Sequence, residues 1–205
     1  MKILPAISES SSVFSYNRFG VAGSDKLKVS QDGLNIVNTL REALTSVGFE
    51  SPFLLVGHLL GGRYANLYAR LYPNEVAGIV FLESSTTKDI SLNEYQGKAV
   101  KTINEMFKVF DSLSSHKQFN EVNFVEKTIN QIHLTDTFPE MPVLCHYWWT
   151  RKSNDARGSS KKNDLRINLE LLSLTRNSKH IVAEKSGHFP QLSEPTIVID
   201  SINFF

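Results

Sequence analysis

The segment 53–62 limits what this chain can fold into more than any other part of the sequence. It starts with four apolar residues, 53–56, and continues through Gly57 to the pair Gly61 and Gly62. A short apolar run bounded by glycine is typical of a strand that is buried on both faces. The residues that follow favour a helix, which Pro73 should end. The segment therefore predicts a fully buried strand, a sharp turn and a helix.

Residues 57–61 have the spacing of a nucleophile elbow, Gly-x-Ser-x-Gly. In that motif the glycines allow the backbone to turn sharply enough to raise one side chain above the sheet. The raised position here holds Leu59. Leucine has no ionisable or nucleophilic atom, so no neighbouring base can activate it. The spacing predicts an elbow, and the residue on it predicts that conventional acyl transfer is absent.

Four segments in the same order make the chain resemble the α/β-hydrolase family, specifically its esterase-like and lipase-like members. Segment 57–62 is similar to the family's Gly-His-Ser-x-Gly-Gly motif, and segment 16–25 to its Tyr-Asp-Arg-x-Gly and Gly-x-Ser-Asp loop, with Asn17 in place of the aspartate. Segment 76–83 resembles the strand after the elbow helix, and segment 186–190 resembles the loop that carries the catalytic histidine.

The periodicity predicts an α/β fold, with a doubly wound and mostly parallel sheet covered by helices on both faces. Expected strands are 12–16, 53–56, 79–82, 143–149 and 181–183, and expected helices are 30–47, 60–72, 165–174 and one capped by Ser193 with Pro195 in its first turn. Gly48 is placed to end the first helix.

The expected domain organisation is a core of residues 1–86 and 141–205 with an insertion at 87–140. Apolar residues at helical spacing predict helices near 100–110 and 122–132 within it. The resemblance implies that this insertion forms a helical lid over the pocket.

The resemblance also implies the site residues. His188 occupies the position of the catalytic histidine and is expected to face Leu59, and the amide of Leu60 matches an oxyanion-hole donor. The acid is either Glu83, at the end of a strand, or Asp155, in the loop after 149. Glu83 is preferred, because the loop around Asp155 lacks the family's compact Gly-x-x-Asp arrangement.

The resemblance further implies that the family's first strands, and the loop that carries its second oxyanion donor, are missing from a chain that is truncated or starts late. Segment 12–16 would then pair directly with 53–56, the sheet would borrow a strand from another molecule, or the N-terminal segment would be poorly ordered. Exposed apolar strand edges are adhesive, so self-association is expected.

The composition bears on the number of domains, the class of partner and the cellular location. The 205 residues are 41% hydrophobic and carry a formal charge of +1, which favours one domain and gives no electrostatic reason for a nucleic-acid partner. Cys145 is the only cysteine, so no intrachain disulfide is possible and a cytoplasmic location is the default expectation. No segment approaches the ~18–20 apolar residues of a membrane span. No metal-ligand cluster or phosphate-binding glycine loop suggests a cofactor.

Two hypotheses follow for function. In the first, the chain is related to serine hydrolases that act on small or apolar carboxylic esters or amides, and Leu59 marks a pseudoenzyme that has lost the reaction. In the second, it is a non-catalytic module on a hydrolase fold that binds a small apolar or ester-like ligand or interacts with a protein.

Overall fold

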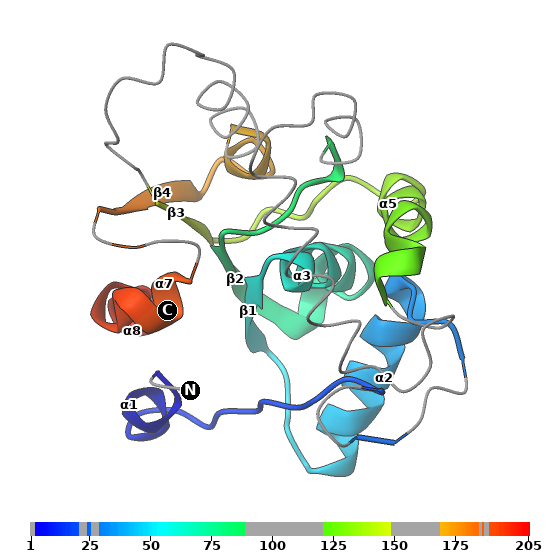
Figure 1. The fold of residues 1–205 in the computed structure, drawn as a ribbon, viewed down its shortest axis with the longest axis horizontal. Coiled ribbons are helices and arrows are strands. Elements are labelled where there is room, and N and C mark those ends of the chain that lie inside the picture. The colour runs from blue at the N-terminus through cyan, green and yellow to red at the C-terminus, as the bar shows by residue number, and fades with distance from the viewer. Residues whose placement is uncertain are drawn as a thin grey trace.

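A parallel β-sheet forms the centre of the protein (Figure 1). The computed structural model describes residues 3–20, 24–25, 29–88, 121–148, 169–184, 186 and 189–205. Within them the sheet has four strands in the order β1-β2-β3-β4, and every neighbouring pair is parallel. The strands are β1 Phe53–His58, β2 Val76–Leu82, β3 Val143–Trp148 and β4 Ser178–Ala183.

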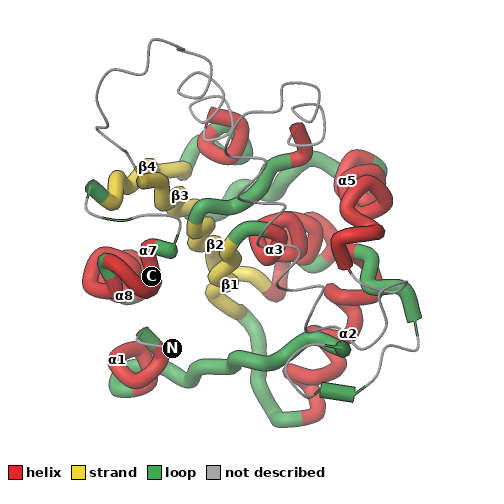
Figure 2. The backbone as a smooth tube through the Cα atoms, viewed as in Figure 1, coloured by secondary structure: helices red, strands yellow, loops and turns green. Residues whose placement is uncertain are grey.

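Helices cover both faces of this sheet (Figure 2). One face carries α2 Gly33–Ser46, α3 Leu60–Leu71 and α5 Val125–His133, and the other carries α1 Leu4–Ser8, α7 Pro190–Ser193 and α8 Pro195–Ile202. Two 3-10 helices, η1 Pro73–Glu75 and η4 Glu121–Phe124, are also described, and residues 169–172 are helical. The predicted α/β, doubly wound, parallel architecture is confirmed. None of the described helices is both long enough and apolar enough to cross a membrane.

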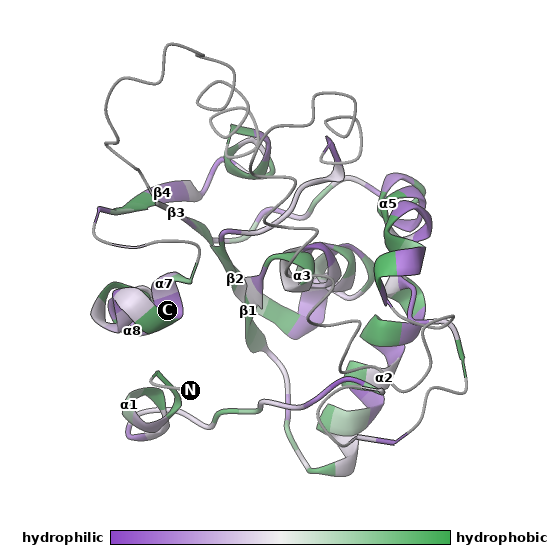
Figure 3. Ribbon diagram, in the orientation of Figure 1, coloured by the Kyte–Doolittle hydropathy of each residue, from purple (hydrophilic) through white to green (hydrophobic). Residues whose placement is uncertain are grey.

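The alternation of side chains along β2 divides the core into two layers. Ile79 and Phe81 pack toward α3, whereas Val80 and Leu82 pack toward α1 and α8. All four side chains are at most 2% exposed. Strands buried on both faces are apolar at nearly every position, which explains the hydrophobic strip through the middle of the molecule (Figure 3).

The outer strand β1 does not have the burial that its sequence predicted. Val56 is 42% exposed, and the side chains of Leu54 and Leu55 are only partly buried. In the described part of the chain β1 pairs with β2 alone, so one long side of the strand lies at the edge of the sheet. The expectation of a fully buried strand is therefore wrong for this structure.

Residues 12–16, expected to be a strand, adopt no regular secondary structure. Val13 packs against the apolar cluster that Leu54 also contacts, and the Phe14 ring lies 5.6 Å from the rings of both Tyr16 and Phe49. These contacts use the side chains without aligning the backbone with β1. The expected direct pairing of this segment with the elbow strand is wrong.

Just after this segment, an ion pair fixes the chain to η4. Arg18 donates through Nε and Nη2 to the two carboxylate oxygens of Glu121, each at 2.7 Å. Tyr64 of α3 donates to the same carboxylate at 3.3 Å, and the Arg18 guanidinium lies over the Tyr64 ring. This bidentate pair joins three parts of the chain that are far apart in sequence.

The predicted lid lies mostly outside the described residues, because 89–120 are not among them. Its C-terminal part, α5, packs on α2 and α3. Gly33 donates its amide to Thr128 Oγ1 at 2.9 Å, and a Cβ atom at Gly33 would lie 2.7 Å from Leu67 and Thr128 side-chain atoms. The lid itself stays a prediction.

The ends of two helices test the sequence signals for them. Gly48, just after α2, has φ +75°, as predicted for a glycine that ends a helix. Pro195 is the first residue of α8, as predicted, but the residue before it is Glu194 and not Ser193. Ser193 instead donates to the carbonyl of Phe189 at 3.0 Å, so its assignment as the cap is wrong.

Asp32 joins the start of α2 to α5. Its carboxylate accepts from the Asn35 amide at 3.4 Å, which caps the helix, and from Lys127 Nζ and Gln131 Nε2 at 2.8 Å each. The side chain is 2% exposed. Burial alone would raise the pKa of Asp32, but the hydrogen bonds outweigh it and lower the pKa to about 2.

We expect Asp32→Asn to lower the free energy of unfolding by about 2–3 kcal/mol, because Lys127 loses its buried partner. The depressed pKa means that the difference between the native protein and the variant is complete above about pH 4 and shrinks as the pH falls toward about 2. Urea unfolding across this pH range measures both effects. The control is Asp200→Asn at an exposed carboxylate, and an equal loss in both variants would contradict the role of Asp32.

Candidate active site

Leu59 joins β1 to α3 in a backbone conformation that L-amino acids rarely adopt, with φ 50° and ψ −118°. Such a conformation costs on the order of 1–3 kcal/mol and persists only when the surroundings fix it. Here the Leu59 amide donates to the carbonyl of Leu82 at 3.4 Å. The Leu59 carbonyl accepts from the amides of Gly62 and Ser85, each at 3.1 Å. The turn is thus tied both to its own helix and to the end of β2.

Two glycines allow the strand, the helix and the end of β2 to approach closely. A Cβ atom at Gly57 would lie 2.7 Å from backbone atoms of Gly61 and Gly62, and one at Gly62 would lie 2.3 Å from the Cβ and Oγ atoms of Ser84. Ser84 Oγ also donates to the Gly57 carbonyl at 2.7 Å, and this hydrogen bond links the chain just after β2 to β1. A Cβ at Gly61 would meet nothing within 4 Å.

Glu83 occupies the matching position at the end of β2. The register pairs His58 with Leu82, so Leu59 and Glu83 follow two paired residues at the carboxyl edge of the sheet. Glu83 also has a positive φ, 46°, and these are the two non-glycine residues with positive φ in the described part of the chain. Its amide donates to the carbonyl of His146 at 3.2 Å. Ligands of α/β proteins bind at this edge.

The amide of Leu60 lies at the start of α3, immediately after the raised position. The first four amides of a helix have no intrahelical acceptor, so such an amide can donate to a negatively charged group. Leu60 itself is 5% exposed. The elbow therefore places a backbone donor in a largely buried setting beside Leu59.

The other two predicted site residues, His188 and Asp155, lie outside the described residues. Phe189, the residue after His188, is described, and its ring lies 5.1 Å from the ring of His58. His58 directly precedes Leu59. The residue after His188 is thus in contact with the residue before the raised position.

Cys145 and His146 of β3 are buried groups with perturbed pKa values, and neither belongs to this edge site. Burial raises the pKa of Cys145 to about 12, so it is a thiol at neutral pH. Burial, with a smaller contribution from His180, lowers the pKa of His146 to about 4. His146 Nε2 lies 2.7 Å from Ser201 Oγ, which in turn donates to the Ile197 carbonyl.

This histidine–serine pair went unrecognised in the sequence, because its only signal is one histidine within an apolar strand. Since the hydroxyl of Ser201 already donates, Nε2 of His146 must carry the proton in this contact. Both side chains are at most 4% exposed, and Ser201 lies on α8. The pair connects α8 to the sheet and does not face the elbow.

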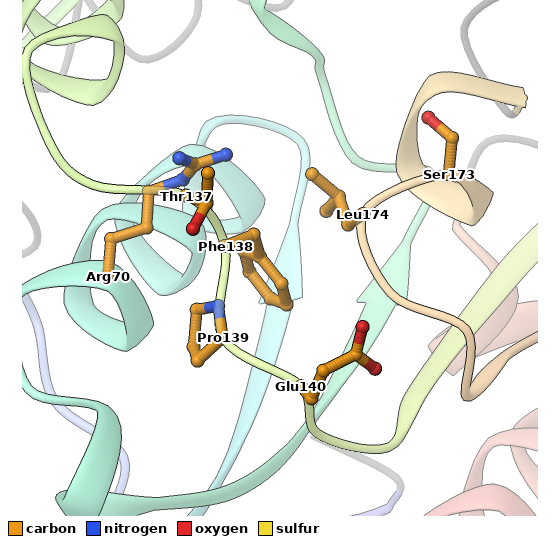
Figure 4. Close-up of a pocket in the computed structure, with 7 residues that line it drawn as sticks. All are labelled: Arg70, Thr137, Phe138, Pro139, Glu140, Ser173 and Leu174. Carbon is orange, nitrogen blue, oxygen red and sulfur yellow. The ribbon is translucent and has the colours of Figure 1, made fainter.

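An open cavity of about 630 Å³ lies at the opposite, amino edge of the sheet (Figure 4). It is lined by Arg70, Thr137, Phe138, Pro139, Glu140, Ser173 and Leu174. Arg70 there already donates to Asn66 Oδ1 and to the Asp136 carbonyl, both at 2.7 Å. The cavity includes none of the predicted site residues. Among the described residues, no three or more His, Cys, Asp or Glu side chains are grouped to hold a metal ion.

The chain belongs to the α/β-hydrolase fold family, whose model matches residues 1–121. An uncharacterised protein of Schizosaccharomyces pombe is 30% identical over 88 residues, which are 43% of this chain and only 16% of that protein. The uncharacterised protein YqjL of Bacillus subtilis is 23% identical over 196 residues, which are 96% of this chain and 73% of that protein.

Solved structures share the fold at low sequence identity. An epoxide hydrolase, CorEH, is 15% identical with a TM-score of 0.60, and the match covers 99% of this chain and 84% of the hydrolase. An esterase from Exiguobacterium antarcticum is 14% identical with a TM-score of 0.56, covering 91% and 78%. A probable hydrolytic enzyme from Pseudomonas aeruginosa PAO1 is 14% identical with a TM-score of 0.59, covering 92% and 74%.

The two adjacent glycines of α3 give a matched test of the close packing at the elbow. Gly61→Ala should leave the free energy of unfolding unchanged or raise it by up to about 1 kcal/mol, because alanine is the better helix former. Gly62→Ala should lower it by about 2 kcal/mol or more, because its Cβ would overlap Ser84. Chemical denaturation measures both, and equal effects would contradict the packing described here.

The strain at Leu59 can be measured by comparing two truncations. Leu59→Gly and Leu59→Ala both remove the side chain, but only glycine adopts this backbone conformation without strain. We expect the glycine variant to be more stable than the alanine variant by about 1–2 kcal/mol. At an ordinary helix or strand position the order is reversed, with glycine about 0.5–1 kcal/mol less stable. Ala43 of α2 is such a position, and Ala43→Gly is the control. A Leu59→Gly variant that is less stable than Leu59→Ala would rule out strain at residue 59.

Proposed function

We propose that this chain descends from serine hydrolases of small or apolar carboxylic esters or amides and that its elbow site no longer performs hydrolysis. The observation that carries the proposal is Leu59 in the strained conformation of the turn, with the glycine packing around it intact. A serine in this position would attack a carbonyl carbon through its hydroxyl oxygen. Leucine offers no such atom, and loss of a triad nucleophile costs on the order of 10⁶-fold in turnover.

The remaining parts of the site have proposed roles. His188 is the general base, oriented by Glu83 or, as the alternative, by Asp155, and the Leu60 amide is an oxyanion donor. The contact between Phe189 and His58 supports the position of the histidine loop, and the register of β1 and β2 supports Glu83. The esterase that shares the fold supports an ester-like ligand class.

A non-catalytic binding function is the second candidate. It is favoured by the partly exposed Leu59, which would give the carboxyl edge an apolar floor where hydrolases have a hydroxyl. Under this reading the insertion 87–140 is a lid over a binding pocket for a small apolar ligand. A cytoplasmic location remains the expectation for either function.

Hydrolysis of p-nitrophenyl acetate and butyrate tests the proposed loss of catalysis. The native chain should release nitrophenol no faster than the buffer does, because position 59 has no nucleophile. His188→Ala is the matched control and should give the same rate. A rate in the native chain that His188→Ala abolishes would overturn the proposal, since another nucleophile would then be using the histidine.

The ancestry of the site is tested by restoring the serine. In Leu59→Ser, a fluorophosphonate probe should label the new hydroxyl in a His188-dependent way, while steady ester turnover recovers little. Leu59→Ala is the matched control and should stay unlabelled. Labelling of Leu59→Ser that persists after His188→Ala would show that the histidine does not act as the base.

A further inference from the structure

Arg70, near the end of α3, places a positive charge in the wall of the cavity at the amino edge of the sheet (Figure 4). Its guanidinium stays protonated at neutral pH, even though burial lowers the pKa of Arg70. In the part of the chain that the structure describes, no carboxylate forms an ion pair with this guanidinium. A charge that is partly removed from water without an ionic partner is costly, so an anion that enters the cavity would compensate it.

Neutral groups hold the Arg70 guanidinium in one orientation. Its Nε donates to Asn66 Oδ1 and its Nη1 donates to the Asp136 carbonyl, both at 2.7 Å. The guanidinium carbon also lies 5.6 Å from the centre of the Phe138 ring, within the range of a cation–π contact. These contacts leave Nη2 without an acceptor among the described residues. An arginine fixed in this way loses little side-chain freedom when it binds a carboxylate, which favours binding.

The neighbours of Arg70 in the wall offer a hydroxyl and an apolar surface. Thr137 directly follows Asp136, and its hydroxyl has no hydrogen-bond partner within the described ranges. Phe138 and Leu174 line the same cavity and are only partly buried, so their side chains can still lose surface to a ligand. The wall therefore combines a cationic donor and a hydroxyl with apolar side chains, which is the mixture typical of small-molecule sites.

Glu140 limits how much negative charge a ligand can carry. Its carboxylate accepts from Thr175 Oγ1 at 2.8 Å. In the close-up, this carboxylate and the Arg70 guanidinium lie on opposite sides of the Phe138 ring (Figure 4). A second anionic group at the far end of a ligand would approach Glu140 and be repelled by it. The two charges of the wall thus favour a ligand with one anionic group and a neutral far end.

We propose that this cavity binds a small organic acid with one carboxylate and an apolar body. The carboxylate accepts hydrogen bonds from the Arg70 guanidinium and the Thr137 hydroxyl, and the apolar body lies against Phe138 and Leu174. The site is at the opposite edge of the sheet from Leu59, so it does not depend on the function proposed for the elbow.

A pair of probes that differ only in charge tests the site in the native chain. In an NMR titration of isotope-labelled protein, 3-phenylpropanoate should bind with a Kd of about 0.1–1 mM and shift the amide signals of residues 136–140 and 173–175. The neutral 3-phenylpropanamide should bind about tenfold more weakly or worse, because it carries no charge for Arg70. Equal affinity for the two probes, or no binding of the acid up to about 10 mM, would overturn the proposal. Shift changes confined to the elbow, around 59–60 and 83–85, would overturn it as well.

Two arginine variants identify the charge that binds the acid. Arg70→Gln should weaken binding of 3-phenylpropanoate by about tenfold or more and leave the affinity for the amide unchanged. Arg176→Gln is the matched control, because Arg176 is an exposed arginine just before β4 that does not line the cavity. It should change the affinity by less than about twofold, since water and salt screen such a charge. Equal weakening by both variants would overturn the role of Arg70.

A dicarboxylate tests the proposed limit of one anionic group. The dianion 3-(4-carboxyphenyl)propanoate should bind the native chain more weakly than 3-phenylpropanoate, and the difference should shrink in Glu140→Gln. A dianion that binds the native chain as tightly as the monoanion would overturn the assigned ligand class.

Discussion

The close approach of the ends of β1 and β2 at the elbow is the constraint on which the rest of the structure depends. Hydrogen bonds from Leu59 to Leu82, and from Ser84 and Ser85 back to the turn, hold the two strand ends together. This approach requires glycine at 57 and 62. It fixes where α3 starts, and with α3 it fixes the layer of core against which α2 and α5 pack.

The elbow also explains why this fold can persist with a leucine at the raised position. A strained turn in an enzyme is usually understood through the nucleophile that it exposes. Here the strained residue is a leucine, and the contacts around it are structural. They join the end of β1, the start of α3 and Ser84, whose hydroxyl donates to the Gly57 carbonyl. The turn therefore serves the packing of sheet on helix whether or not position 59 carries a nucleophile. Replacing the residue at position 59 need not cost the fold.

Local signals in the sequence predicted the parts of the fold that short-range chemistry determines. The elbow, α3 and the end of α2 at Gly48 could be read from glycine, proline and apolar spacing, because those residues act on their own backbone. The burial of β1 could not, since it depends on which strand lies beside it. The hydrogen bonds of Asp32 could not be predicted either, because Lys127 and Gln131 come from a helix about a hundred residues further along the chain. Residues 12–16 alternate like a strand, but alternation does not supply a pairing partner.

The candidate site consists of residues that the structure describes and residues that lie outside the described part of the chain. Leu59, Leu60 and Glu83 belong to the elbow and the adjoining strand end, and the structure describes all three. We propose that His188 faces the raised position of this elbow. A crystal structure that resolves the loop after β4 tests it most directly. We expect the His188 imidazole to lie within about 8 Å of the Leu59 side chain, which allows for the hydrogen-bond range of ~2.6–3.2 Å and for leucine in place of serine. An imidazole that lies farther away or points out of the carboxyl edge would contradict it.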